Sequence, residues 1–430
     1  MKRREKREER SDISFLGKVF LILKSLKNRL RNLHPVDKTL NKQKMLAGVS
    51  DSDAPVENKV SLVFYLWRVI AIILLCLILV FTLLFGGRII SYENVYYMFK
   101  DIEYISSFNE NTPETLSYSK PLTNQDFASF KNGLAIVGDS EFKFFTSSGR
   151  ATMAIGSEYS NPKIATSKSN ALIYDQGNRS FGVYNSFVCL HKETLESPIS
   201  SGHMADDGSF CIVTASRGFG SKVRVYDNKF NLEAEYIKND YVISAKMSPN
   251  GKHIAVASLS VQNGEGKVSL NLMQRDREEV RFTKSFTDAI PYSVEFLSKD
   301  RIALISDSSV RVFDLSGNQR SEYKYPASLT HISASDGRCV LVFGKNTVVL
   351  DENGMVIRSF GVDCEIFDVQ VFKDNVYLLC DREIRRYNTK GVSSEFDVIP
   401  FAEENARLII LDDGTPLACT DTVAYYISFN

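Results

Sequence analysis

The chain has 430 residues, with 52 basic and 52 acidic residues and therefore no formal net charge. That balance hides an asymmetry, because residues 1–60 carry fifteen Lys or Arg and eight Asp or Glu, whereas residues 88–430 carry 36 and 44. The seven cysteines include no CxxC pair and no tight cluster, which excludes a small disulfide-rich scaffold.

Residues 1–60 are predicted to form a basic tail. Within it, residues 13–33 place Leu16, Phe20 and Leu23 at helical spacing with Lys and Arg at the other positions. This pattern predicts a basic amphipathic helix that lies on a lipid surface. A helix that docks on a partner, or one that packs on a soluble domain, is the alternative. The N-terminal basic run also raises nucleic acid as a partner, but acidic residues interrupt it and no aromatic interleaving, helix-turn-helix or zinc spacing supports that role.

An uncharged run from Val69 to Gly87 follows, bracketed by Arg68 and Arg88. About 20 apolar residues suffice for a helix to cross the hydrocarbon core, so we expect one transmembrane helix within residues 61–87. The basic flank predicts a cytoplasmic N-terminus and an extracytoplasmic C-terminal region, held in the cell membrane by an uncleaved signal anchor. A cleaved signal peptide fits less well because the run is long and lies far from the N-terminus, and a buried core helix is a weaker alternative.

Residues 88–121 are predicted to form a juxtamembrane stalk and a closing strand. Tyr92, Tyr96, Tyr97 and Phe99 lie just beyond the span, where aromatic side chains suit the membrane interface. The last part of this region, Thr115 to Lys120, has the composition of a short strand.

Residues 122–430 contain a repeated hairpin in which a pair of aromatic or aliphatic residues precedes a turn rich in Asp, Asn, Ser and Gly. The second residue of each pair is Phe145, Tyr184, Tyr226, Met273, Phe313, Leu350, Tyr387 and Tyr426. These positions recur about every 40 residues, the period of four-stranded propeller blades. We therefore predict an all-β chain: a β-propeller with eight four-stranded blades, or seven if one weak repeat is an insertion.

A second hairpin turn is predicted upstream in several repeats, at Lys131-Asn-Gly133, Asp206-Asp-Gly208, Pro249-Asn-Gly251, Asp336-Gly337 and Asp413-Gly414. Asn-Gly and Asp-Gly accept the positive φ of tight hairpins. The last repeat, residues 405–430, shows only three strands, and Thr115 to Lys120 is expected to supply its outer strand. Gln262 to Lys267, a polar insertion between two strands of one repeat, is predicted to be a contact loop.

No motif in the sequence assembles a catalytic, cofactor or metal site. There is no Gly-x-Ser-x-Gly elbow, and Gly218-Phe-Gly220-Ser221 is interpreted as a loop because no Gly-Lys-Ser/Thr of a phosphate-binding loop follows it. The five histidines, His34, His191, His203, His253 and His331, fall in different segments. Asp206-Asp207-Gly208, Asp351-Glu-Asn-Gly354 and Asp412-Asp413-Gly414 lack the remaining ligands of a calcium loop and are interpreted as turns. Most cysteines, including Cys211, Cys339, Cys380 and Cys419, lie in apolar strand-like runs and are interpreted as small buried side chains, although one or two disulfides are compatible with the sequence.

The φ-φ-Asp-x-x-Gly hairpins and the single preceding span together resemble an uncharacterised family of membrane-anchored Gram-positive envelope proteins with a WD40-like or quinoprotein-like propeller ectodomain. The resemblance covers Trp67 to Asn430. Quinoprotein and WD40 repeats carry a Trp in each blade, whereas this chain has only Trp67. No quinone or other cofactor is therefore implied.

These observations favour a non-catalytic scaffold that binds a protein or glycan of the cell envelope through loops of the propeller. The alternative is a transmembrane sensor whose propeller binds a small ligand or wall fragment and whose basic helix relays the signal. An enzyme is a third hypothesis that no motif supports, and the lipid bilayer is an expected partner of the span and the basic helix.

Overall fold

The computed structural model describes residues 67–77, 114–118, 125–216, 220–262, 264–277, 279–390, 396–403 and 405–429. The chain divides into two compact units, Met1–Ile90 and Ser91–Asn430. In the first unit residues 67–77 are helical. Within the described part of the chain, no helix has both the length and the apolar character needed to cross a membrane.

Several predicted segments lie wholly or partly outside the described residues: the tail 1–60 with its helix at 13–33, the span 61–87 and the stalk 88–121. Those three assignments stay predictions.

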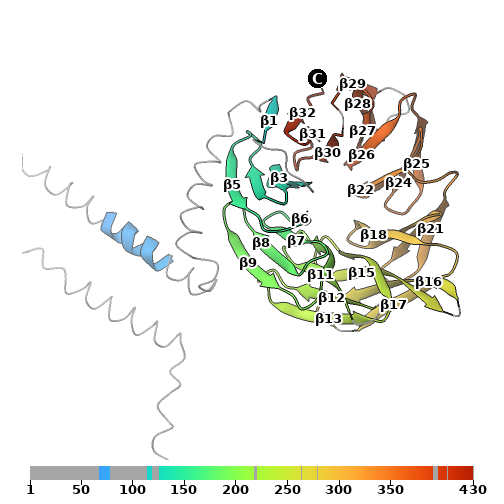
Figure 1. Cartoon of the computed structure of the whole chain (residues 1–430), viewed down its shortest axis with the longest axis horizontal. Coiled ribbons are helices and arrows are strands. Elements are labelled where there is room, and N and C mark those ends of the chain that lie inside the picture. Colours follow the sequence, from blue (N-terminus) through green and yellow to red (C-terminus); the bar gives the residue numbers. More distant parts are fainter. Residues whose placement is uncertain are drawn as a thin grey trace, which may run out of the picture. The chain divides into compact units, whose positions relative to one another are not determined.

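The second unit contains eight four-stranded antiparallel sheets arranged as the blades of a ring (Figure 1). The predicted all-β propeller with eight blades is confirmed, and the seven-blade alternative is wrong. In each blade the strand named first below lies nearest the central channel.

The first four blades have the following strands. Blade 1 has β2 (Asp126–Phe130), β3 (Gly133–Val137), β4 (Glu141–Phe145) and β5 (Ala151–Gly156); blade 2 has β6 (Pro162–Thr166), β7 (Ala171–Asp175), β8 (Ser180–Tyr184) and β9 (Cys189–Thr194); blade 3 has β10 (Ile199–Met204), β11 (Phe210–Ala215), β12 (Ser221–Tyr226) and β13 (Leu232–Lys238); blade 4 has β14 (Tyr241–Met247), β15 (His253–Gln262), β16 (Glu265–Gln274) and β17 (Val280–Phe286).

The other four blades continue in the same order. Blade 5 has β18 (Pro291–Ser298), β19 (Arg301–Ser306), β20 (Ser309–Asp314) and β21 (Gln319–Lys324); blade 6 has β22 (His331–Ser335), β23 (Arg338–Phe343), β24 (Asn346–Asp351) and β25 (Val356–Gly361); blade 7 has β26 (Ile366–Phe372), β27 (Asn375–Cys380), β28 (Glu383–Asn388) and β29 (Phe396–Pro400); blade 8 has β30 (Arg407–Ile410), β31 (Pro416–Cys419), β32 (Val423–Tyr426) and β1 (Thr115–Ser117).

The ring closes through β1, which forms the outer strand of blade 8. It pairs antiparallel with β32, with Leu116 opposite Ala424 (Figure 1). Leu116 and Tyr118 are buried against residues of blades 8 and 1, among them Leu417 and Phe145. The expected closing strand is thereby confirmed, and closure leaves no blade without a fourth strand.

The described residues of the propeller form eight hydrophobic clusters, one between each pair of neighbouring blades. The second and third strands are almost continuously buried, as in β7 and β20, because both their faces pack against adjacent sheets. The outer strands alternate exposed and buried positions, as in β25. Stacking of the blades therefore buries apolar faces that a single repeat would leave exposed.

The predicted hairpins are also confirmed. All eight aromatic or aliphatic positions are the last or the next-to-last residue of the third strand of a blade. The upstream turns join the first and second strands, and Lys131, Asn132 and Asp336 adopt positive φ there as tight hairpins require.

The insertion at Gln262 to Lys267 differs from its prediction as a loop. β15 and β16 pair along their whole length, from His253 opposite Gln274 to Gln262 opposite Glu265. The two strands therefore extend as a hairpin, and Gly264 adopts positive φ at its tip, as a tight turn requires.

Candidate binding site at the channel mouth

The two faces of the propeller are defined by the direction of the inner strands. The upper face is the one where inner strands begin, and it carries the links between blades and the turns between second and third strands. The lower face carries the turns between first and second strands and between third and fourth strands. This definition follows from the antiparallel order of every sheet.

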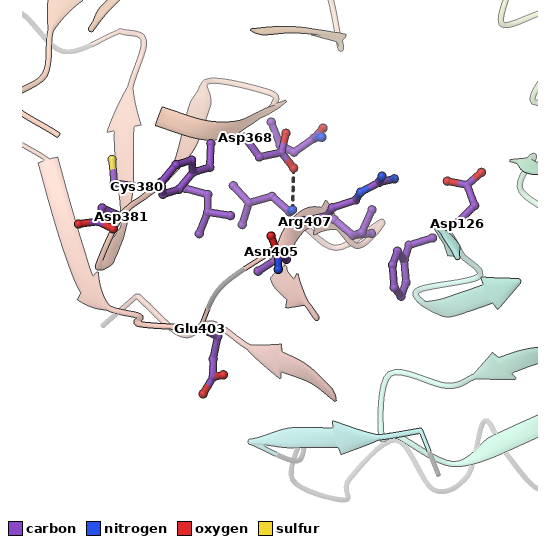
Figure 2. Close-up of a pocket in the computed structure, with 14 residues that line it drawn as sticks. Asp126, Asp368, Cys380, Asp381, Glu403, Asn405 and Arg407 are labelled. Carbon is purple, nitrogen blue, oxygen red and sulfur yellow. Dashed lines mark hydrogen bonds between the residues drawn. The ribbon is translucent and has the colours of Figure 1, made fainter. Parts of the chain in front are cut away.

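A cavity of about 890 Å³ opens at the upper face among blades 7, 8 and 1 (Figure 2). Its lining includes Asp126 at the start of β2, Asp368 on β26, Arg407 at the start of β30, and Glu403 in the link between blades 7 and 8. These side chains come from segments nearly 300 residues apart that the closure of the ring brings together.

The carboxylates of Asp126 and Asp368 each hold the inner strand of the next blade. An oxygen of Asp126 accepts the backbone N–H of Ile164 at 3.1 Å. Asp368 accepts the N–H groups of Leu408 and Val369, each at 2.8 Å. Both carboxylates are thus used in joining blades, since each satisfies backbone donors near the channel wall.

Arg407 lies between Asp368 and Asp126 in the cavity (Figure 2). Burial raises the pKa of Asp126, and the Ile164 N–H, Lys163 and Arg407 partly oppose this shift. Burial likewise raises the pKa of Asp368. The backbone N–H groups of Leu408 and Val369, and the charges of His331 and Arg407, act in the opposite direction. The positive charge of Arg407 thus favours the ionised form of both acids.

The same kind of interblade hydrogen bond recurs around the channel. Side chains on three other inner strands accept a backbone N–H from the inner strand of the next blade: His203 from Met247 at 3.1 Å, Ser244 from Val294 at 3.3 Å and Ser333 from Val371 at 3.1 Å. Burial lowers the pKa of His203 well below its usual range, and the positive charge of Lys246 lowers it further. A neutral imidazole suits this role because its Nδ1 must act as an acceptor.

Four inner strands contain a β-bulge near their upper end, where one extra residue is inserted opposite the second strand. The extra residues are Ser200, Ile243, Tyr292 and Phe367. Bulges re-aim side chains and are common beside functional sites. Phe367 lines the cavity and is 48% exposed, which places an aromatic ring at its rim.

A second cavity, of about 580 Å³, lies at the lower face among blades 2 to 6. Lys246 and Glu295 line it and form an ion pair at 3.3 Å. His203 also lines this cavity. The two cavities lie toward opposite ends of the inner strands. Because charged side chains line both cavities, the channel wall is polar toward both faces.

The structure does not bring the candidate metal ligands together. His203 and His331 lie on inner strands of blades 3 and 6, while His191 and His253 lie on β9 and β15. His34 lies outside the described residues. Among the residues that the structure describes, no three His, Cys, Asp or Glu side chains form a group able to hold a metal ion.

The three loops that superficially resemble calcium loops serve as turns and interblade contacts. Asp351 accepts the backbone N–H groups of Asn353 and Met355. Asp207 pairs with Arg275 at 2.9 Å. Asp412 accepts the N–H of Asn132 at 3.0 Å and thereby joins blade 8 to blade 1.

The cysteines divide into three groups, the first being the exposed free thiols Cys76 and Cys189. Cys211, Cys339 and Cys419 are buried free thiols, as the apolar runs around them predict. Cys380 is buried, as the apolar run around it predicts, and it forms a disulfide of the kind that the sequence leaves open, with Cys364 at a Cα distance of 5.9 Å. Cys364 lies in the link that precedes β26, so the disulfide fixes this link beside Phe367.

Sequence reasoning missed the acceptors of the interblade bonds and the pairing of Cys364 with Cys380. Asp368 does leave a signal, since it interrupts the apolar run from Ile366 to Phe372 with a charge. Cys364 leaves none, because its partner is determined by the folding of blade 7 and the link before it.

Comparison with solved structures supports the fold. The chain is similar to BamB from Moraxella catarrhalis, with a TM-score of 0.53 and 8% identity over 74% of this chain and 99% of BamB. It is also similar to Sqt1 from Saccharomyces cerevisiae, with a TM-score of 0.56 and 11% identity over 74% of this chain and all of the Sqt1 chain. At such identities the likeness shows a shared propeller fold alone.

No curated protein matches the sequence. A protein-family model does match, over residues 106–398, and this range covers blades 1 to 6 and most of blade 7. The chain therefore belongs to DUF5711, a family of unknown function.

Proposed function

We propose that this protein is a membrane-anchored, non-catalytic propeller that binds a protein of the cell envelope at its upper face. The observation that carries the proposal is that the acidic side chains at the channel mouth accept backbone hydrogen bonds. Asp126 and Asp368 accept backbone N–H groups of the next blade, which favours a structural role over acid–base chemistry. The upper rim, with its open cavity and exposed Phe367, provides the contact surface.

The anchor and the extracytoplasmic location are part of the same proposal. They rest on the uncharged run from Val69 to Gly87 and on the basic residues that precede it. The disulfide between Cys364 and Cys380 supports an oxidising compartment, because disulfides persist outside the reducing cytosol.

Photo-crosslinking in intact membranes tests the binding role. A photoreactive residue at position 367 of the full-length chain is expected to give one discrete protein adduct, which mass spectrometry identifies. A photoreactive residue placed in the identified partner is expected to crosslink back to this chain. The matched control carries the same residue at Lys168, an exposed lower-face position. Equal adducts at the two positions, or none at position 367, would contradict binding at the upper rim.

The disulfide gives a separate prediction about location. Protein alkylated in intact cells before lysis, then digested without reductant, is expected to yield a linked peptide containing Cys364 and Cys380. Cys189, an exposed free cysteine, is expected to carry the alkylating label and serves as the control. Labelled, unlinked Cys364 and Cys380 in freshly quenched cells would argue against an oxidising compartment.

A further inference from the structure

The two faces of the propeller differ strongly in charge. Among the described residues, the connections between strands at the upper face hold eleven acidic and three basic residues, a difference of eight negative charges. The acidic ones are Asp139, Glu158, Glu196, Asp240, Asp288, Asp307, Asp363, Glu365, Asp381, Glu403 and Asp421, and the basic ones are Arg179, Lys345 and Arg382. The described connections at the lower face hold eleven acidic and ten basic residues. The negative charge of the loops is thus concentrated on one face.

An exposed apolar patch lies on this acidic face at blades 4 and 5. It consists of Tyr241, Val261, Ile290 and Tyr292, whose exposed fractions are 54, 73, 54 and 53%. Large apolar side chains that gather on the surface of a soluble domain commonly mark an interaction site.

The strand register brings the segments that carry these four residues close to one another. Tyr241 lies directly opposite Leu259, and Val261 follows two residues later on the same face of β15. Leu259 packs against the cluster between blades 4 and 5, so this face is turned toward blade 5. The inner strands of the two blades also run side by side, since the N–H of Val294 donates to Ser244. Counting back three residues on each strand places Tyr241 beside Pro291, the first residue of β18, which lies between Ile290 and Tyr292 in the chain.

Carboxylates surround the patch. Asp240 precedes Tyr241, and Glu265 lies at the tip of the β15–β16 hairpin opposite Gln262. Asp307 accepts the N–H of Ile290 at 2.9 Å, and Asp288 lies two residues before Ile290 while it pairs with Arg311. An apolar centre with a charged rim is the usual anatomy of a protein interface.

β1 runs antiparallel to β32, with Thr115 opposite Tyr425 and Ser117 opposite Val423. Because β32 begins at the upper face, the antiparallel strand β1 runs from the lower face toward the upper face. Blades 4 and 5 also lie across the ring from the closure at blades 8 and 1 (Figure 1).

We infer that the patch formed by Tyr241, Val261, Ile290 and Tyr292 is the docking site for a protein segment that is basic and carries large apolar side chains. Charge complementarity with the acidic rim implies that the partner segment is positively charged. The apolar centre implies that large apolar side chains anchor the segment. This inference rests on the proposed binding function and specifies the chemistry of the partner.

The test uses the full-length chain in nanodiscs of zwitterionic lipid and three labelled 14-residue peptides. The first alternates Lys with Leu and Trp, the second replaces each Lys with Glu, and the third replaces each apolar residue with Gly. We expect the first peptide to bind at least tenfold more tightly than either of the others. Raising the salt concentration from 50 to 300 mM should weaken that binding several-fold, because rim charges are screened.

Substitutions locate the binding. The double variant Tyr241→Ser, Tyr292→Ser is expected to weaken binding of the first peptide about tenfold, since aromatic side chains commonly anchor interfaces. Tyr292→Phe should retain the affinity because it keeps the ring. Met355→Ser is the matched control, since Met355 is 60% exposed on a lower-face turn. Thermal unfolding followed by circular dichroism is expected to be the same for all variants, because each replaced side chain is largely exposed.

The outcomes separate this inference from the proposed function. Equal binding of the basic and acidic peptides, or equal losses from the Tyr and Met355 variants, would overturn the docking site at blades 4 and 5. If crosslinking at position 367 still recovers a partner in that case, the binding function stands and only the chemistry assigned to the partner fails. If position 367 yields no partner but the patch binds the basic peptide as expected, the docking site stands and binding at the channel mouth fails.

Discussion

Replacing Leu116 with Ala is expected to lower the free energy of unfolding of the propeller by about 2–4 kcal/mol. Leu116 is 6% exposed and packs with Leu134 and Leu417, so its side chain joins blade 8 to blade 1. Truncation leaves a cavity at the junction where the ring closes. Urea unfolding of the detergent-solubilised chain, followed by circular dichroism, measures the change.

Thr115→Ala is the matched control for Leu116→Ala. Thr115 belongs to the same short strand but is exposed, so its replacement should change the unfolding free energy by less than about 0.5 kcal/mol. Similar effects of the two substitutions would show that β1 contributes little to closure, which would contradict the pairing of β1 with β32.

The architecture of the propeller was predictable because local patterns determine most of it. The pairs ending at Phe145, Tyr226 and Phe313 mark the end of a third strand, and the Asp or Gly that follows marks a turn; each feature requires only a few consecutive residues. The closing strand was predictable because the last repeat shows only three strands, whereas each of the other blades has four. Such reasoning depends on periodicity, which is visible in one sequence.

The site was much less predictable because its parts come from different blades. Asp126 and Asp368 are isolated acids in the sequence, and only the closure of the ring brings them to one cavity with Arg407. The bulges that expose Tyr292 and Phe367 depend on the pairing of two strands, for which no turn residue gives a signal. The polar segment Gln262 to Lys267 was expected to be a loop, whereas pairing between β15 and β16 extends into it as far as Gln262 and Glu265.

The repeated Asp at the end of the third strand has a structural role that the turn pattern only partly indicates. In blade 5, Asp314 accepts the backbone N–H groups of Ser316 at 2.8 Å and Asn318 at 2.9 Å. It also pairs with Arg320 at 2.6 Å. Asp227 makes the same pair of backbone bonds in blade 3, to Lys229 and Asn231. One carboxylate thus fixes the turn that leads into the outer strand.

Asp314→Ala is expected to lower the free energy of unfolding by about 2–3 kcal/mol near neutral pH, because several hydrogen bonds to a charged acceptor are lost together. Asp314→Asn keeps an acceptor for the turn and should cost about half as much. Urea unfolding of both variants beside the wild-type chain measures these differences. A full loss in the Asn variant would show that the ion pair with Arg320, and not the turn, carries the stabilisation.

The pH dependence of this stabilisation has a definite sign. Although burial would raise it, hydrogen bonds from Asn318 and Ser316, and then from Arg320, lower the pKa of Asp314 to about 2. The ionised form is therefore favoured in the folded state, so the contribution of Asp314 is fully present above its unfolded pKa of about 4 and is lost as the pH falls toward 2. The difference in stability between the wild-type chain and Asp314→Ala should accordingly be constant from pH 7 to pH 5 and shrink between pH 4 and pH 2. A difference that stays constant down to pH 2 would mean that the carboxylate is not ionised in the turn, and the hydrogen bonds assigned to it would then have to be explained by a protonated acid.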